Sequence, residues 1–76
     1  MAPRVDGFNG LSFYIYSADH NPPHVHVYYG EYEALVAIST GAIIRGSLPR
    51  AQAREAQDHV RHQQSRFMSE WNRLNP

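Results

Sequence analysis

The sequence predicts a single α+β domain, residues 1–76, in which an antiparallel β-meander of about four strands packs against a C-terminal helix. Apolar and polar residues alternate through the first half of the chain, and turn residues separate the alternating runs. After residue 49 an apolar spacing of three to four residues replaces the alternation. The chain has no cysteine, so one small core must hold it without disulfides.

The first expected strand covers residues 11–16, where Leu11, Phe13 and Ile15 alternate with serine and tyrosine. Residues 17–23 follow and end in two consecutive prolines. Proline supplies no N–H and restricts the residue before it, so this segment is expected to be a stiff loop.

The next two strands, 24–29 and 32–38, are expected to form a hairpin closed by Gly30 and Glu31, since glycine allows a tight turn. Side chains alternate strictly along a strand, so the register assigns each residue to a face. The core face would carry Val25, Val27, Tyr29, Tyr32, Ala34, Val36 and Ile38, and the opposite face would carry His24, His26, Tyr28, Glu33, Leu35 and Ala37.

A three-residue loop ending at Gly41 leads to a fourth expected strand, 42–47, with Ala42 and Ile44 on the core side. Residues 50–74 are expected to be helical, continuous or broken near 63–65, with Pro49 in the first turn. The stripe expected to face the sheet consists of Ala53, Ala56, Val60, Phe67, Met68, Trp71 and Leu74.

Net charge and hydropathy argue against several classes of protein. The formal net charge is zero, which argues against a protein built mainly to coat nucleic acid. No apolar run has the length of a signal peptide or of a membrane span. We therefore expect no membrane association, and the absence of cysteine favours a cytoplasmic protein, since small secreted domains usually depend on disulfides.

Histidines cluster around the proline loop. His24 and His26 lie two apart on an expected strand, so their imidazoles share one face, and His20 with Asp19 lies across the loop. This spacing occurs in zinc sites, where histidines and a carboxylate supply three or four ligands. A divalent transition metal such as zinc, bound by Asp19, His20, His24 and His26, is one interpretation.

Two other interpretations stay open for the same segment. His24 or His26 can transfer protons near neutral pH without a metal, with Glu33 as a catalytic partner. The segment can also be a rigid turn whose polar side chains bond backbone amides and perform no chemistry.

Charged and aromatic residues outside the loop suggest contacts. Arg50 and Arg54, one helical turn apart, can bind a phosphate or an RNA backbone, although a charged solvent face beside Glu55 and Asp58 is the simpler explanation. His59 and His62 are interpreted as part of that solvated face. The histidine-bearing face also carries Tyr14, Tyr16 and Tyr28, which we expect to form a pocket wall or an interface in a homodimer or with a protein partner.

The run DHNPPHVHVYYGEYEA, residues 19–34, resembles the signature of a family of small bacterial proteins classed as a domain of unknown function, typically DHNPPHFHARYGEYEA. Supporting matches extend over the chain, from Pro3 to the Glu70–Trp71 pair. The helix departs from the family at Gln52, Arg54, Gln57 and His59, where leucine is more usual.

The resemblance implies a place in a toxin–antitoxin-like or mobile-element module. The leading hypothesis is that the histidine-rich segment is the active or metal site of such a component, with phosphodiester hydrolysis as the reaction. The alternative is a non-enzymatic interaction module, antitoxin-like or inhibitory, that uses its tyrosine and histidine face.

Overall fold

A computed structural model describes residues 4–76 and shows a five-stranded antiparallel meander followed by two helices. The strands lie in chain order across the sheet: β1 (Arg4–Phe8), β2 (Leu11–Tyr14), β3 (His24–Tyr29), β4 (Tyr32–Ala37) and β5 (Ile43–Ser47). The helices are α1 (Arg50–His62) and α2 (Gln64–Leu74). The predicted α+β class and meander topology are confirmed.

The prediction of four strands missed β1. This edge strand pairs with β2 through a turn in which Asn9 and Gly10 both adopt positive φ. Its sequence, RVDGF, contains two charged residues and a glycine, and most of it is exposed. It therefore lacks the apolar alternation that identifies a half-buried strand. The strand β2 is also shorter than expected and ends at Tyr14.

The hairpin of β3 and β4 has the predicted register. His26 lies opposite Leu35 and Tyr28 lies opposite Glu33. The core face is confirmed at Val25, Val27, Ala34, Val36 and Ile38, all fully buried. Tyr32 was wrongly assigned to the core: it lies beside the turn at the end of the hairpin, beyond the cover of the helices, and is 48% exposed.

The assignment of Ala42 and Ile44 to the core side of the fourth strand is wrong. The register between β4 and β5 shifts at a bulge, so that Leu35 pairs with Arg45 and Val36 pairs with Ile43. A bulge inserts one residue and reverses the faces beyond it. Ile43 consequently packs on the core, and Ile44 is 45% exposed.

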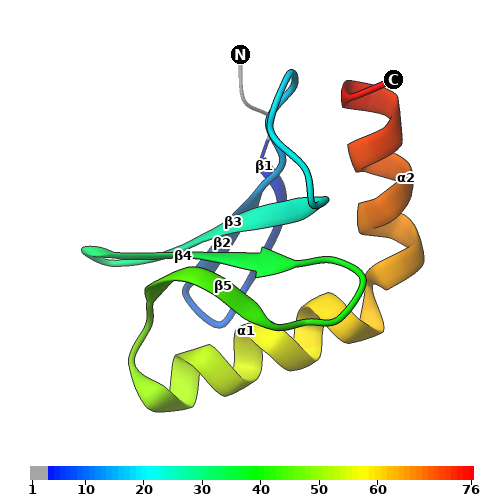
Figure 1. The fold of residues 1–76 in the computed structure, drawn as a ribbon. Helices are drawn as coiled ribbons and strands as arrows, with labels where there is room; N and C mark the ends of the chain where they lie inside the picture. The colour runs from blue at the N-terminus through cyan, green and yellow to red at the C-terminus, as the bar shows by residue number, and fades with distance from the viewer. Residues whose placement is uncertain (1–3) are drawn as a thin grey trace.

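The helical segment is broken at Gln63, within the expected interval, and Pro49 immediately precedes α1. In Figure 1, α1 runs beneath the sheet. The chain then turns steeply, and α2 rises at a large angle to α1 beside the loop that precedes β3. The predicted apolar stripe is confirmed: Ala56, Val60, Phe67 and Trp71 are buried, and Ala53, Met68 and Leu74 pack at their margin. No helix within residues 4–76 is long and apolar enough to cross a membrane.

Candidate functional site

The loop between β2 and β3 carries Asp19 and is fixed by the end of α2. Asn75 accepts a hydrogen bond from the Asp19 backbone N–H (2.8 Å) and donates to the Tyr16 carbonyl (3.1 Å). The Asn21–Pro22 peptide bond in this loop is cis. The two hydrogen bonds of Asn75 therefore tie the loop to the end of α2, and the Asp19 carboxylate is held over the first residues of β3.

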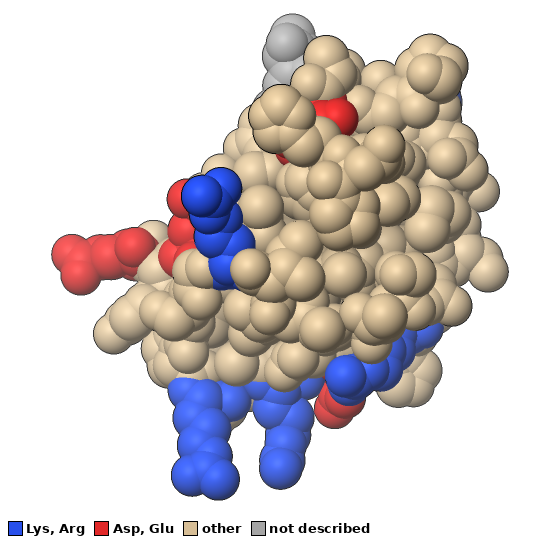
Figure 2. All heavy atoms as spheres, in the orientation of Figure 1, with Lys and Arg blue, Asp and Glu red and all other residues tan. Residues whose placement is uncertain are grey.

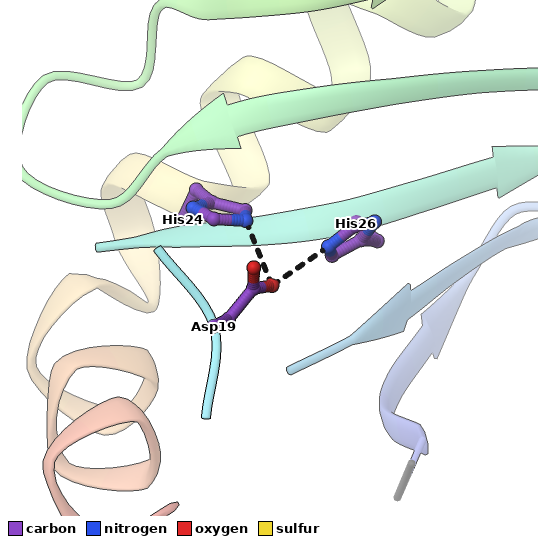
Figure 3. A group of neighbouring side chains, drawn as sticks. All are labelled: Asp19, His24 and His26. Atoms are coloured by element: carbon purple, nitrogen blue, oxygen red, sulfur yellow. Dashed lines mark hydrogen bonds and ion pairs between the residues drawn. The ribbon is translucent and has the colours of Figure 1, made fainter. Parts of the chain in front are cut away.

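The imidazoles of His24 and His26 converge on this carboxylate (Figure 3). Asp19 Oδ2 lies 3.0 Å from His24 Nε2 and 3.1 Å from His26 Nε2. One potential ligand atom from each of the three residues lies within 4.8 Å of the others. The two-residue spacing on a strand, predicted to place both rings on one face, is what brings them to the same oxygen.

The second nitrogen of each ring faces an acceptor. His24 Nδ1 lies 2.8 Å from the Pro22 carbonyl oxygen, and His26 Nδ1 lies 3.2 Å from Glu33 Oε2. Neither a carbonyl nor an ionised carboxylate can donate, so each Nδ1 must carry the proton. In the neutral rings both Nε2 atoms then present lone pairs to Asp19, which is favourable only if a proton or a cation lies between them.

Asp19 has the negative charge that a cation site requires. Burial alone raises the pKa of its carboxyl group, but the His20 backbone N–H and, when their rings are protonated, His26 and His24 outweigh burial and lower the pKa below its usual value. Asp19 is therefore a carboxylate at neutral pH.

Three tyrosines pack beside the cluster. The Tyr16 ring meets the His26 ring edge-on, with centroids 4.4 Å apart, and its hydroxyl lies 2.8 Å from the Tyr28 hydroxyl. Tyr14 packs edge-on against Tyr28. Burial, the Tyr16 hydroxyl and the charge of Glu33 raise the pKa of Tyr28 above its usual range, so this hydroxyl stays protonated. The three tyrosines lie together on the histidine face, as predicted.

The cluster lines an open pocket of about 560 Å³. This volume falls within the range of small-molecule sites. Its wall is formed by Asp19, His20, Asn21, Pro22, His24, His26, Glu33, Leu35, Ile44, Arg45 and Gly46.

The predicted site residues do not all meet. Asp19, His24, His26 and Glu33 come together, whereas His20 is exposed and places no ligand atom in the cluster. The expectation that both histidines avoid the core is wrong for His24, which is 4% exposed and packs against Trp71. The reason is that α2 extends past the end of the sheet and covers the start of β3 (Figure 1).

The expected phosphate contacts lie elsewhere. Arg50 and Arg54 line a separate depression on α1, where much of the positive charge in Figure 2 gathers. The arginine in the histidine pocket is Arg45. Sequence reasoning did not select it, although the expected alternation, with Ile44 on the core side, already turned Arg45 to the opposite face; the pairing of Arg45 with Leu35 is what brings it to the pocket.

The assignment of His59 to a solvated face is also wrong. Its Nε2 lies 2.5 Å from Asp6 Oδ2, and its ring stacks on Phe8 with centroids 4.8 Å apart. His59 thus joins α1 to β1, the strand that the sequence did not predict. His62 is exposed, as expected.

Similarity to known proteins is found at the level of a sequence family. Residues 10–72 match a family described as a domain of unknown function, DUF4160. No curated protein and no solved structure matches the chain.

Proposed function

The chain belongs to the DUF4160 family of proteins of unknown function, and from its site we propose that it binds a divalent transition metal and hydrolyses phosphodiesters. The observation that carries this proposal is the convergence of two histidine Nε2 atoms on Asp19 Oδ2, with both Nδ1 atoms bonded to acceptors. Metal-binding histidines usually donate the other ring N–H to a carbonyl or a carboxylate in this way.

The separations support a shared cation. Two ligand atoms at the usual zinc distances of about 2.0–2.1 Å lie roughly 3.3 Å apart in a tetrahedron. The two nitrogen–oxygen separations of 3.0 and 3.1 Å are within a few tenths of an ångström of this value. A cation between these atoms would replace the repulsion of facing lone pairs by three bonds.

Two histidines and one carboxylate leave a coordination position open to water. A metal bound there supplies a Lewis acid and lowers the pKa of its bound water toward neutrality. Glu33 holds the His26 ring through Nδ1, and the Pro22 carbonyl holds the His24 ring. The protein's own contribution is therefore to fix ligand orientation before the metal arrives.

The place of this activity in a toxin–antitoxin-like module rests on the family resemblance alone. A second candidate function, a non-enzymatic interaction module, is favoured by the position of the tyrosines. Tyr14, Tyr16 and Tyr28 are only half-buried and lie on the sheet face that the helices leave uncovered.

Metal content and hydrolysis test the leading proposal. Protein purified without a histidine tag should contain zinc, nickel or manganese, or gain thermal stability when one is added, because a ligand at a hundredfold its Kd adds about 2.7 kcal/mol. Asp19→Asn and His26→Gln should abolish this gain. His62→Gln, the same substitution at an exposed helical histidine, is the matched control and should retain it.

The activity is measured with bis(p-nitrophenyl) phosphate on the metal-loaded protein. We expect hydrolysis that chelation removes and that Asp19→Asn abolishes. Metal binding without hydrolysis would favour the interaction module, with the metal as a structural element. The absence of both metal and thermal shift would refute the site.

A further inference from the structure

A row of paired residues crosses the sheet from the histidine cluster to Arg45. Tyr14 pairs with His26, His26 with Leu35, and Leu35 with Arg45. Residues directly opposite one another on neighbouring strands project from the same face. Arg45 therefore shares the face of His26, two strands away, and lines the same pocket.

The guanidinium of Arg45 is free to bind a ligand. Within residues 4–76 it forms no hydrogen bond or ion pair, whereas Arg61, Arg66 and Arg73 each contact a carboxylate. A guanidinium presents a planar set of N–H donors that matches two oxygens of a phosphate or a carboxylate. Arg45 thus places an uncommitted anion-binding group at the rim of the pocket.

The spacing leaves room for one phosphate group. Two strand intervals separate His26 from Arg45, about 9–10 Å between backbones. Leu35 occupies the strand between them and offers no donor or acceptor side chain. An anion bound here would be held from its two sides, by Arg45 and by the group at the histidine cluster, over an apolar floor to which Ile44 also contributes.

The charges in the pocket couple the anion to the metal. Asp19 and Glu33 carry two negative charges against the single positive charge of Arg45, so the metal-free pocket disfavours an anion. A divalent cation at Asp19, His24 and His26 reverses the sign. Anion binding and metal binding should therefore strengthen each other by the same factor.

We infer that Arg45 is the anion-binding residue of the pocket, and that the pocket takes a phosphate ester held between Arg45 and the metal-loaded cluster of Asp19, His24 and His26. This inference rests on the metal site of the proposed function. It replaces Arg50 and Arg54, the phosphate contacts that the sequence suggested, by a residue on the sheet.

The test is a titration of the zinc-loaded protein with dimethyl phosphate, a soluble diester, followed by amide chemical shifts in NMR. The wild-type protein should bind the probe with shifts centred on residues 44–46. Arg45→Gln should weaken the probe's affinity about ten- to a hundredfold, as expected for losing hydrogen bonds to a charged group. Arg45→Lys should retain part of the affinity, and Arg50→Gln, the matched control, should retain all of it.

Zinc affinity, measured without the probe, separates the two proposals. Arg45→Gln should leave it unchanged or slightly raised, because the removed charge repels the cation. Zinc binding with an affinity for dimethyl phosphate that Arg45→Gln does not alter, or that Arg50→Gln reduces instead, would overturn the role of Arg45 alone. Failure of the wild-type protein to bind zinc would overturn the metal site and this inference with it.

Discussion

Single residues in this chain serve both the core and the site, and His24 is the clearest case. Its Nε2 contacts Asp19 in the pocket, while its ring packs on Trp71 of the core. Replacing it would disturb packing together with any ligand role. His26, which is half-buried, and Asp19 are the better positions for testing chemistry, because their loss removes less of the core.

How well the site could be predicted also depends on the residue. The partnership of Asp19, His24 and His26 followed from sequence, because a spacing of two on a strand fixes the face and the prolines keep the loop short. The exclusion of His20 did not follow, since the direction of a loop side chain depends on backbone angles that residue types do not specify. Asn75, which holds Asp19, lies 56 residues away and has no local signal.

The environment of Asp6 leads to a prediction about how the stability of the fold depends on pH. Burial raises the pKa of its carboxyl group, but hydrogen bonds from His59, the Gly7 N–H and Arg66, with the charge of Arg66, outweigh burial and hold the pKa below its usual value. A folded-state pKa below the unfolded one stabilises the fold at pH values above the unfolded pKa, and this stabilisation is lost as the pH falls through the folded pKa. Asp6 should therefore contribute to the loss of stability below about pH 3.8.

Asp6→Asn tests this contribution by urea denaturation at several pH values. We expect the variant to lose about 1–2 kcal/mol at pH 7, because hydrogen bonds to a charged acceptor are weakened. Its stability should then fall less steeply than that of the wild-type protein below pH 3.8. Parallel curves for the two proteins would show that the ion pairs of Asp6 contribute nothing to folding.

At the scale of elements, the two main errors, the missed β1 and the faces of β5, fall where the chain departs from regular alternation. The hairpin of β3 and β4 and the two helices followed from periodicity, because each buries one regular face or stripe. The edge strand β1 buries little, so its sequence is not constrained to alternate. The bulge in β5 exchanges the faces of Ile43 and Ile44, and two adjacent isoleucines cannot reveal which of them faces the core.

The end of β5, two residues beyond the bulge, leads to a prediction about Gly46, which pairs with Ala34. This residue has φ +75°, and a Cβ atom there would clash with the Glu33 carbonyl oxygen of β4. Gly46→Ala must therefore displace the β4–β5 pairing, whereas Gly30→Ala, at φ +56° in open space, meets only the left-handed backbone. We expect a cost of about 1–2 kcal/mol for Gly30→Ala and at least about 2 kcal/mol more for Gly46→Ala.

Urea midpoints measured for both variants compare these costs. Because the pocket includes the bulge, Gly46→Ala should also lower the affinity for any pocket ligand, while Gly30→Ala should not. Equal losses of stability would mean that β5 relaxes freely around position 46 and that this end of the strand is not a fixed feature of the pocket.

The whole molecule has one covered and one uncovered sheet face. The helices pack on the side of Phe13, Val27 and Val36, and the opposite side carries the pocket and the tyrosines. The chain exposes 4623 Å², close to the roughly 4700 Å² expected for a compact monomer of its mass. Its surface is therefore no larger than normal, and assembly is not needed to complete the core.

The last prediction concerns self-association through the tyrosine face. The sequence suggested a homodimer or a bound partner on grounds of marginal stability; in the structure the stronger reason is the half-buried aromatic surface formed by Tyr14, Tyr16 and Tyr28 beside the pocket. We expect reversible dimerisation, with a mass near 8.7 kDa at low concentration that rises toward twice this value as concentration increases. Light scattering over a micromolar concentration series measures it, with Tyr14→Ala lowering the association and Tyr32→Ala, on the other face, leaving it unchanged. A constant mass near 8.7 kDa in all three proteins would mean that the tyrosines form no interface, because their contacts with one another and with His26 then satisfy them within one chain.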